Sequence, residues 1–206
     1  MSKWEIEQSW FDQGVQLICG ADEAGAGPLA GPVYAGAVIL PVGLELPWLN
    51  DSKHVTEKRR DMLFDQIKEQ AVAWAVACIE PEEIDEIDIL NARMKAMQMA
   101  IDQLDPVPEL ALIDGNRDHG SRFGITIRHQ TVIKGDSLSA NIAAASILAK
   151  VSRDRKMEEL DHLYPEYGFA KHKGYPTKAH YEALDRLGPS PVHRNSFLVK
   201  WREKRR

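Results

Sequence analysis

The spacing of apolar residues along the chain changes between two periods, and each period predicts one kind of element. Short apolar runs that are rich in β-branched residues and bounded by turn residues predict strands. They fall at about residues 15–22, 33–40, 71–79 and 110–113, with a last strand suggested over 125–127 and 132–133. The first two runs flank a loop rich in glycine and proline, so we expect them to form an antiparallel pair.

Apolar residues at spacings of three and four predict the helices. The strongest pattern begins at Pro81, which suits a first helical turn, and continues to Leu104. Further helices are expected at about residues 56–70, 139–163 and 177–187, with Thr56 and Thr177 as N-caps. Strands and helices alternate after an opening hairpin, which predicts an α/β domain with a mixed sheet, helices on its faces and further helices towards the C-terminus.

The length of 206 residues fits one domain, which we place over residues 1–206 with a helical C-terminal part from about residue 165. No apolar run is long enough to span a membrane, and the N-terminus lacks the apolar core of a signal peptide. Cys19 and Cys78 both lie in apolar, strand-like runs, which favours buried thiols over a disulfide. A reducing, cytoplasmic location is therefore expected.

The formal net charge of −5 gives no sign of nucleic-acid binding. The distribution of charge matters more than its sum when a site contains several acids. Basic residues gather at 150–156, at 171–173 and at 201–206. Each cluster could also be a solvated helix face or tail, and for the last cluster that interpretation is favoured.

The candidate chemistry lies where apolar strands end in an acid near glycine, at Asp22, Asp114 and Asp136. Ligands of open α/β sheets gather at strand ends, and carboxylates that converge there need a cation between them. Oxygen ligands favour Mg²⁺ or Mn²⁺, and no His/Cys set has the spacing of a zinc site. Simpler interpretations stay open: Asp22 in a solvated acidic turn, Asp114 as a turn residue, and Asp136 as an acid at a helix N-terminus.

Several strings together resemble one family. The run from Asp22 to Val33 is similar to the first signature of the type 2 ribonucleases H, specifically bacterial ribonuclease HII. Residues 113–116, 134–137, 143–154 and 172–177 match further signatures of that family, so the resemblance covers roughly residues 15–197. One functional position departs from the pattern, because Ala26 stands where the family has arginine in a Gly-Arg-Gly loop.

The resemblance implies a ribonuclease H-like fold and two-metal hydrolysis with Mg²⁺ or Mn²⁺. Its metal ligands and catalytic residues would be Asp22, Glu23, Asp114 and Asp136. The substrates implied are RNA/DNA hybrids and single ribonucleotides embedded in duplex DNA, cut on the 5′ side, as in ribonucleotide excision repair. We expect a monomer that binds nucleic acid and no membrane.

The family signatures also suggest how the substrate is held. The backbone of Gly25, Ala26 and Gly27 would read the 2′-hydroxyl, and Tyr175 would stack on a neighbouring sugar. Candidate phosphate contacts are Asn50, Ser52, Lys53, Lys150, Lys173 and Arg194. Glu23 raises a geometric problem, because neighbouring residues on a regular strand point to opposite faces. Either the strand bends there or Glu23 also contributes its carbonyl.

Two other classes of function remain open from the residues alone. A metal-dependent phosphatase could use the same acids without any groove for a duplex. A binder of RNA/DNA hybrids with impaired catalysis would fit a site in which Ala26 marks decay, and an active enzyme could be weakened by the same change.

Overall fold

The computed structural model describes residues 3–49 and 55–205. Its sheet has the strand order β3-β2-β1-β4-β5, in which β1 pairs antiparallel with β2 and parallel with β4. The pair β2–β3 is antiparallel and the pair β4–β5 is parallel, so the sheet is mixed as expected. The strands are β1 (Ile18–Ala24), β2 (Val33–Ile39), β3 (Ala73–Ile79), β4 (Leu110–Asp114) and β5 (His129–Val132).

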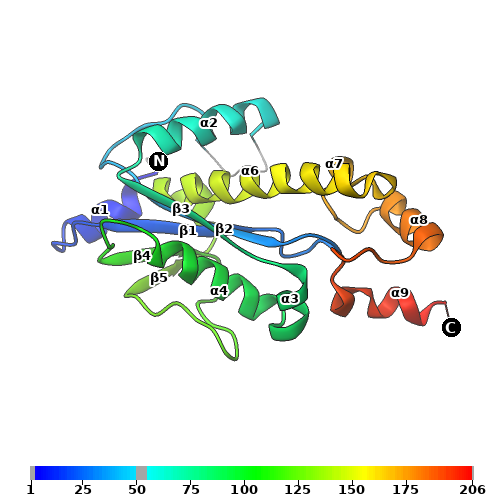
Figure 1. The fold of residues 1–206 in the computed structure, drawn as a ribbon. Helices are drawn as coiled ribbons and strands as arrows, with labels where there is room; N and C mark the ends of the chain where they lie inside the picture. The colour runs from blue at the N-terminus through cyan, green and yellow to red at the C-terminus, as the bar shows by residue number, and fades with distance from the viewer. Residues whose placement is uncertain (1–2, 50–54, 206) are drawn as a thin grey trace.

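Helices cover both faces of the sheet (Figure 1). The long helix α6 (Ala140–Leu163) lies on one face with α2 (Glu57–Gln70) outside it, and α4 (Ile89–Asp102) lies on the other face. The remaining helices are α1 (Glu5–Phe11), α3 (Pro81–Ile87), α5 (Gly135–Leu138), α7 (Phe169–His172), α8 (Lys178–Leu187) and α9 (Val199–Glu203), with short 3₁₀ turns at Pro165–Tyr167 and Asn195–Leu198. No helix in the described ranges is long and apolar enough to cross a membrane.

Three sequence expectations are wrong in detail. The helix predicted over 81–104 is two helices, because Asp88 takes a positive φ of 66° and its side chain accepts a hydrogen bond from the Asn91 amide, which starts α4 afresh. Residues 125–127 form no strand, and the last strand is β5 alone. Asp136 lies in the first turn of α5 rather than at a strand end.

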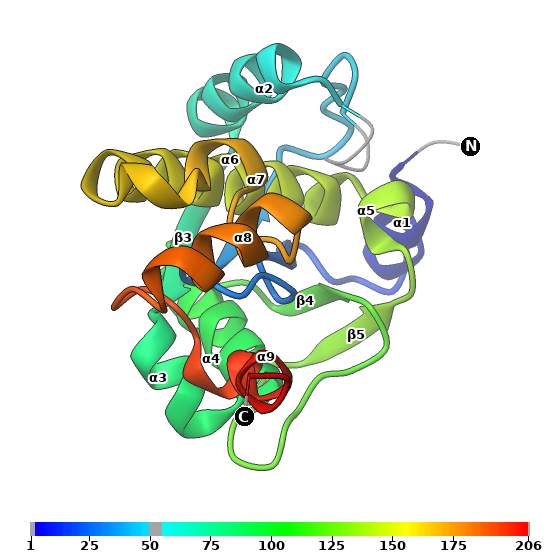
Figure 2. The same ribbon diagram turned by 90° about the vertical axis from the view of Figure 1, so that its right-hand side faces the viewer.

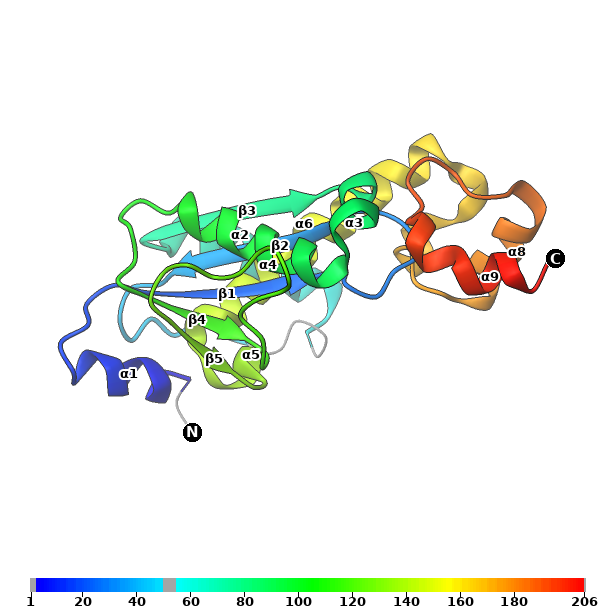
Figure 3. The ribbon, with the colours of Figure 1, turned by 90° about the horizontal axis from the view of Figure 1, so that it is seen from below.

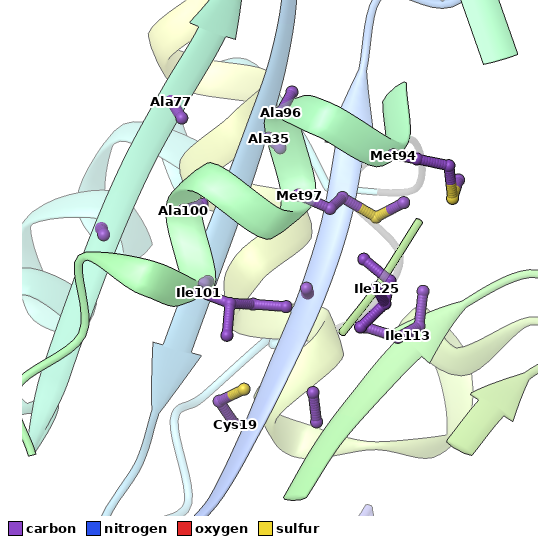
Figure 4. Packing of buried hydrophobic residues seen from close by; sticks show 14 of the residues in the cluster. Cys19, Ala35, Ala77, Met94, Ala96, Met97, Ala100, Ile101, Ile113 and Ile125 are labelled. Atoms are coloured by element: carbon purple, nitrogen blue, oxygen red, sulfur yellow. The ribbon is translucent and has the colours of Figure 1, made fainter. Parts of the chain in front are cut away.

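The core on the α4 side is built from small and flexible side chains (Figure 4). One face of α4 packs on residues from four strands, and the side chains in contact are Cys19, Ala35, Ala77, Met94, Ala96, Met97, Ala100, Ile101 and Ile113. All are less than a tenth exposed. The methionines are therefore core residues, as the helical spacing predicts.

On the other face, α6 approaches the strands closely because two strand residues lack side chains. A Cβ atom on Gly20 would collide with the backbone of Asn141, and one on Gly36 would collide with the Ala145 carbonyl oxygen. The facing surface of α6 is rich in alanine, and the helix is fully buried from Ile142 to Ala145. Backbone-to-backbone packing thus fixes the height of α6 over β1 and β2.

The C-terminal helices α7, α8 and α9 gather beyond one end of the sheet (Figures 2 and 3). Phe169 is fully buried there among three histidines, His172, His180 and His193. The Nε2 atoms of His180 and His193 are 2.9 Å apart, and His193 Nδ1 accepts a hydrogen bond from the Ser190 amide. Burial lowers the pKa of His180 and of His193 to about 4. Both rings are therefore neutral at neutral pH.

We predict that Gly36→Ala destabilises the protein by about 3 kcal/mol, the upper end of the range for overpacking a core. The added methyl group has to displace the main chain of α6, which cannot rotate away as a side chain would. Urea unfolding measures the change. Gly14→Ala is the control, because nothing lies within 4 Å of that Cβ and only its φ of +89° opposes the change. Equal stability of Gly36→Ala and the parent would contradict the close approach.

We also predict that the two neutral histidines reduce stability as the pH falls from about 6.5 to 4. Between these pH values His180 and His193 are protonated in the unfolded chain but neutral in the native protein. Because the unfolded state binds more protons, the free energy of unfolding rises with pH. His180→Gln should flatten this dependence in urea titrations at a series of pH values. The exposed His162 offers a control, since His162→Gln should leave the slope unchanged. An unaltered slope in His180→Gln would show that the ring is not held neutral.

Candidate active site

The register of the parallel pair β1–β4 brings two acids together. Ala21 lies opposite Ile113, so Asp22 and Asp114, the next residues along the two strands, are neighbours at the end of the sheet where β4 stops. Asp114 Oδ1 accepts hydrogen bonds from the amides of Gly135 (2.7 Å) and Asp136 (3.4 Å). The strand end is thereby tied to the start of α5.

Asp22 is almost completely buried, with 6% of its surface exposed. Burial raises its pKa well above the ordinary value, and the charges of Glu23 and Asp114 raise it further. A hydrogen bond with the Ser146 side chain, which reaches down from α6, and one from the Glu23 amide (2.7 Å) oppose this shift. The environment of Asp22 therefore disfavours the carboxylate form that it would need to hold a cation, unless the cation is present.

Glu23 follows the alternation of a regular strand, because Asp22 pairs with Gly36 and Glu23 with Ala35 without a bulge. Its side chain meets α4, where Arg93 Nη2 lies 2.6 Å from Oε1. The other oxygen, Oε2, is buried and has no hydrogen-bond partner in the described part of the chain. Burial raises the pKa of Glu23 against the opposing charge of Arg93.

One cavity of ≈ 300 Å³ collects most of the predicted site. Its lining includes three acids and the glycine loop, together with residues from α6 and the C-terminal part: Asp22, Glu23, Asp114, Gly25, Ala26, Gly27, Ser146, Lys150, Arg153 and Tyr175. Asp136 is absent from this lining. Its main-chain oxygen accepts a hydrogen bond from Lys3 Nζ (3.1 Å), and its amide faces Asp114.

The donor set fits a hard divalent cation in its chemistry. All candidate ligands are carboxylates, one buried carboxylate oxygen is unpartnered, and the acids raise one another's pKa as like charges do. Within residues 3–49 and 55–205, however, no three Asp, Glu, His or Cys side chains are close enough to share one ion. The acids surround the cavity without converging on one point.

Two buried arginines support the glycine loop, which is the segment 25–32 between β1 and β2. Arg194, fully buried, donates hydrogen bonds to main-chain oxygens of the loop, and Arg153, 1% exposed, lies against Gly25. In this structure the Arg194 guanidinium faces carbonyl groups inside the protein, so its contacts give no support to the predicted phosphate contact, which stays a prediction.

The other predicted substrate contacts are divided. Tyr175 is 43% exposed beside Gly27, with its Cε1 3.8 Å from a Cβ built there. Lys150 lines the cavity and pairs with Asp154 (2.6 Å), whereas Lys173 pairs with Glu158 (2.7 Å) outside it. Three further predicted contacts lie outside the described residues: Asn50, Ser52 and Lys53.

Three residues of the site were not predicted. Ser146 is the one polar residue in an otherwise apolar stretch of α6, and that exception is a signal that could have identified it. Arg93 is one of three charged residues in the largely apolar α4, and nothing in its spacing shows that it turns towards Glu23. Arg153 lies in the charged second half of α6 but within the family signature at 143–154, and that match is a signal that could have identified it.

Comparison with known proteins places these features in a family. The family model for ribonuclease HII matches residues 19–201. The ribonuclease HII of Vibrio parahaemolyticus is 54% identical over 196 residues, which cover 95% of this chain and 91% of that protein. The ribonuclease HII of Desulfitobacterium hafniense strain Y51 is 54% identical over 193 residues, covering 94% and 72% respectively.

Solved structures agree with the sequences. The ribonuclease H2 of Pyrococcus horikoshii superposes with a TM-score of 0.73 at 25% identity, covering 92% of this chain and 98% of that one. The RNase HII of Archaeoglobus fulgidus, solved as a complex with PCNA, gives 0.73 at 26% identity, covering 87% and 94%. With the matched family model and the strand-end acids, these likenesses show that the chain belongs to the ribonuclease HII family and is an endoribonuclease acting on RNA/DNA hybrids.

Proposed function

We propose that the enzyme also nicks duplex DNA on the 5′ side of a single embedded ribonucleotide, and that it does so with Mg²⁺ or Mn²⁺. The observation that supports this proposal is the shared cavity, which is lined by three acidic residues, the glycine loop and Tyr175. A phosphodiester held by the loop would lie beside the acids, and the exposed ring of Tyr175 would lie beside the sugar.

The residues proposed to hold the metal are Asp22, Glu23, Asp114 and Asp136. When bound, a pair of divalent ions lowers the pKa of an attacking water and stabilises the leaving oxygen. Asp22 lies two residues before the end of β1, and Asp114 is the last residue of the neighbouring strand β4. Glu23 has one buried oxygen, Oε2, without a partner in the described part of the chain, and the Asp136 amide borders the Asp114 carboxyl group.

The protein's own groups supply the rest of the proposed chemistry. Ser146 shares a hydrogen bond with the Asp22 carboxyl group, and Arg93 pairs with one oxygen of Glu23, which fixes the side chain of that acid. The low bulk of Gly25 and Gly27 lets the main chain approach a sugar closely. Lys150 and Lys173 are paired with acids of α6, and as phosphate contacts they would exchange these partners for the substrate.

Asp114→Asn should keep the fold but reduce nicking by orders of magnitude, because it removes a formal charge from the proposed metal site while hardly changing the shape. The assay is a gel of a DNA duplex that carries one ribonucleotide, incubated with Mg²⁺ or Mn²⁺. Parent and variant should bind the duplex equally. Cleavage by Asp114→Asn at nearly the parent rate would contradict the proposal that Asp114 is a metal ligand.

The same gel separates the rival functions. A nick 5′ to the ribonucleotide supports the proposal. Binding of the duplex without a nick supports an impaired hybrid binder, and hydrolysis of small phosphomonoesters alone supports a phosphatase.

Tyr175→Ala should impair cleavage more than Tyr175→Phe. Phenylalanine loses only a hydroxyl hydrogen bond, worth about 0.5–1.5 kcal/mol, whereas alanine also loses stacking worth about 1–3 kcal/mol. The ring lies over the Arg153 guanidinium at 5.8 Å, a contact that Tyr175→Phe retains. Steady-state kinetics on the single-ribonucleotide duplex compare the two variants. Equal losses would show that stacking is not the role of this ring.

A further inference from the structure

Arg194 is a fully buried cation whose hydrogen bonds all go to main-chain oxygens. Its Nη2 donates to the Gly25 carbonyl (2.7 Å), its Nη1 to the Ala26 carbonyl (3.1 Å) and its Nε to the Gly31 carbonyl (2.9 Å). One planar guanidinium thus holds both ends of the glycine loop. Arginine is rarely fully buried unless it is paired, so this arrangement requires an explanation.

The direction of two peptide groups follows from these contacts. In a trans peptide the N–H points opposite to the C=O of the preceding residue, and the chain's cis bond in the described part lies elsewhere, at Asp105–Pro106. Because the carbonyls of Gly25 and Ala26 point at Arg194, the amides of Ala26 and Gly27 point away from it. Neither amide donates a hydrogen bond to any described protein atom. Both residues line the cavity that contains the acids.

We propose that Arg194 is a positioning residue, which turns the amides of Ala26 and Gly27 into the cavity as donors for the 2′-oxygen of the ribonucleotide. This inference rests on the proposed function and on the family resemblance, which already implies that the main chain of the loop forms a cradle for that hydroxyl group; what it adds is the role of Arg194. Successive N–H groups that face one concavity are a known way to bind an anionic or polar oxygen. The cradle needs no side chain at position 26.

A second arginine, Arg153, also supports the loop. Arg153, from α6, donates to the Pro32 carbonyl (3.1 Å) and to the Lys173 carbonyl (2.9 Å), which ties the end of the loop to the segment before Tyr175. A Cβ atom on Gly25 would collide with the Arg153 side chain, and Gly25 has a φ of +97°. The loop conformation is therefore specified by glycine and two guanidinium groups together.

Holding two cations here is unfavourable in itself. Burial, and then the charge of Arg153, lower the pKa of Arg194 to about 9. An apolar side chain would fill the same volume without this penalty, as replacements of buried charges in other proteins show. An apolar side chain, however, has no hydrogen-bond donors. The reason for an arginine here is therefore that its donors fix the direction in which the loop peptides point.

Arg194→Lys tests the inference, because lysine keeps the charge but loses the rigid fork that matches three carbonyls. We expect kcat/KM on a duplex with one ribonucleotide to fall about ten- to hundredfold, as the loss of two donors implies. The affinity for the all-DNA duplex of the same sequence should stay within twofold of the parent value. The salt dependence of binding should be unchanged. Binding of both duplexes is also measured in EDTA, so that the ribonucleotide preference is tested without cleavage.

Leu63→Ala is the matched control, since Leu63 is equally buried but packs between α2 and α6. It should lower thermal stability while leaving KM and the ribonucleotide preference at parent values. Should Arg194→Lys behave like Leu63→Ala, the arginine is merely structural. A salt slope flatter by about one unit, with an equal loss on all-DNA duplex, would instead make Arg194 a phosphate contact. Either result overturns the proposal.

A second variant removes a cradle donor while Arg194 itself stays unchanged. Replacing Ala26 by lactic acid deletes one N–H and turns the Gly25 carbonyl into an ester carbonyl, a weaker acceptor for Arg194 Nη2. The ribonucleotide preference in EDTA should fall severalfold in this variant, and an unchanged preference overturns the proposal even where Arg194→Lys does not fold. A parent protein that shows the preference but fails to nick contradicts the proposed function and leaves the cradle standing.

Discussion

The contact between α6 and the sheet determines where the site can form. Gly20 and Gly36 leave room for the backbone of α6 to rest directly on β1 and β2. At that height Ser146 reaches the Asp22 carboxyl, and the start of the helix lies beside the end of β4, where Asp114 binds the amides of α5. Side chains larger than hydrogen at the two glycines would lift the helix and separate the serine from the acid. The packing of the core and the geometry of the acids are thus one constraint.

Charge in this region is arranged at a cost to stability. Asp22 and Glu23 are buried next to Asp114, and their raised pKa values show that the protein alone does not compensate for their charges. Arg153 and Arg194 are buried next to the loop without a carboxylate partner among their hydrogen bonds. Arg93 pairs with Glu23, but Asp22 and Asp114 have no arginine partner among the described residues. The two arginines next to the loop bind carbonyl groups instead. Arrangements that reduce the stability of the protein in this way are typical of sites where a bound ligand balances the charges.

Much of the fold followed from the sequence because local patterns and the tertiary structure agree. The strands of the opening hairpin are apolar runs on either side of the glycine loop, and the sequence after Ser139 has no glycine or proline before Pro165; the structure confirms both strands and the helix. The break at Asp88 was missed, since the apolar spacing continues through it and the cause is one residue with positive φ. The surroundings of Arg194 were missed for a different reason. A single sequence shows that a residue is basic but not whether it faces solvent or carbonyl groups, and here the guanidinium is buried against the carbonyls of the loop.

Both ends of the chain support the backbone that carries the site. At the N-terminal side, the buried Glu7 of α1 accepts a hydrogen bond from Ser139 Oγ (2.6 Å) at the start of α6, and Lys3 donates to the carbonyls of α5. These residues precede the segment matched by the family model, which begins at residue 19. At the C-terminal side, Arg194 holds the glycine loop. The acid-bearing turn of Asp136 and the loop of Ala26 are short segments with little core of their own, so their conformations depend on partners far away in sequence. A truncation at either end would therefore act on the site before it acts on the sheet.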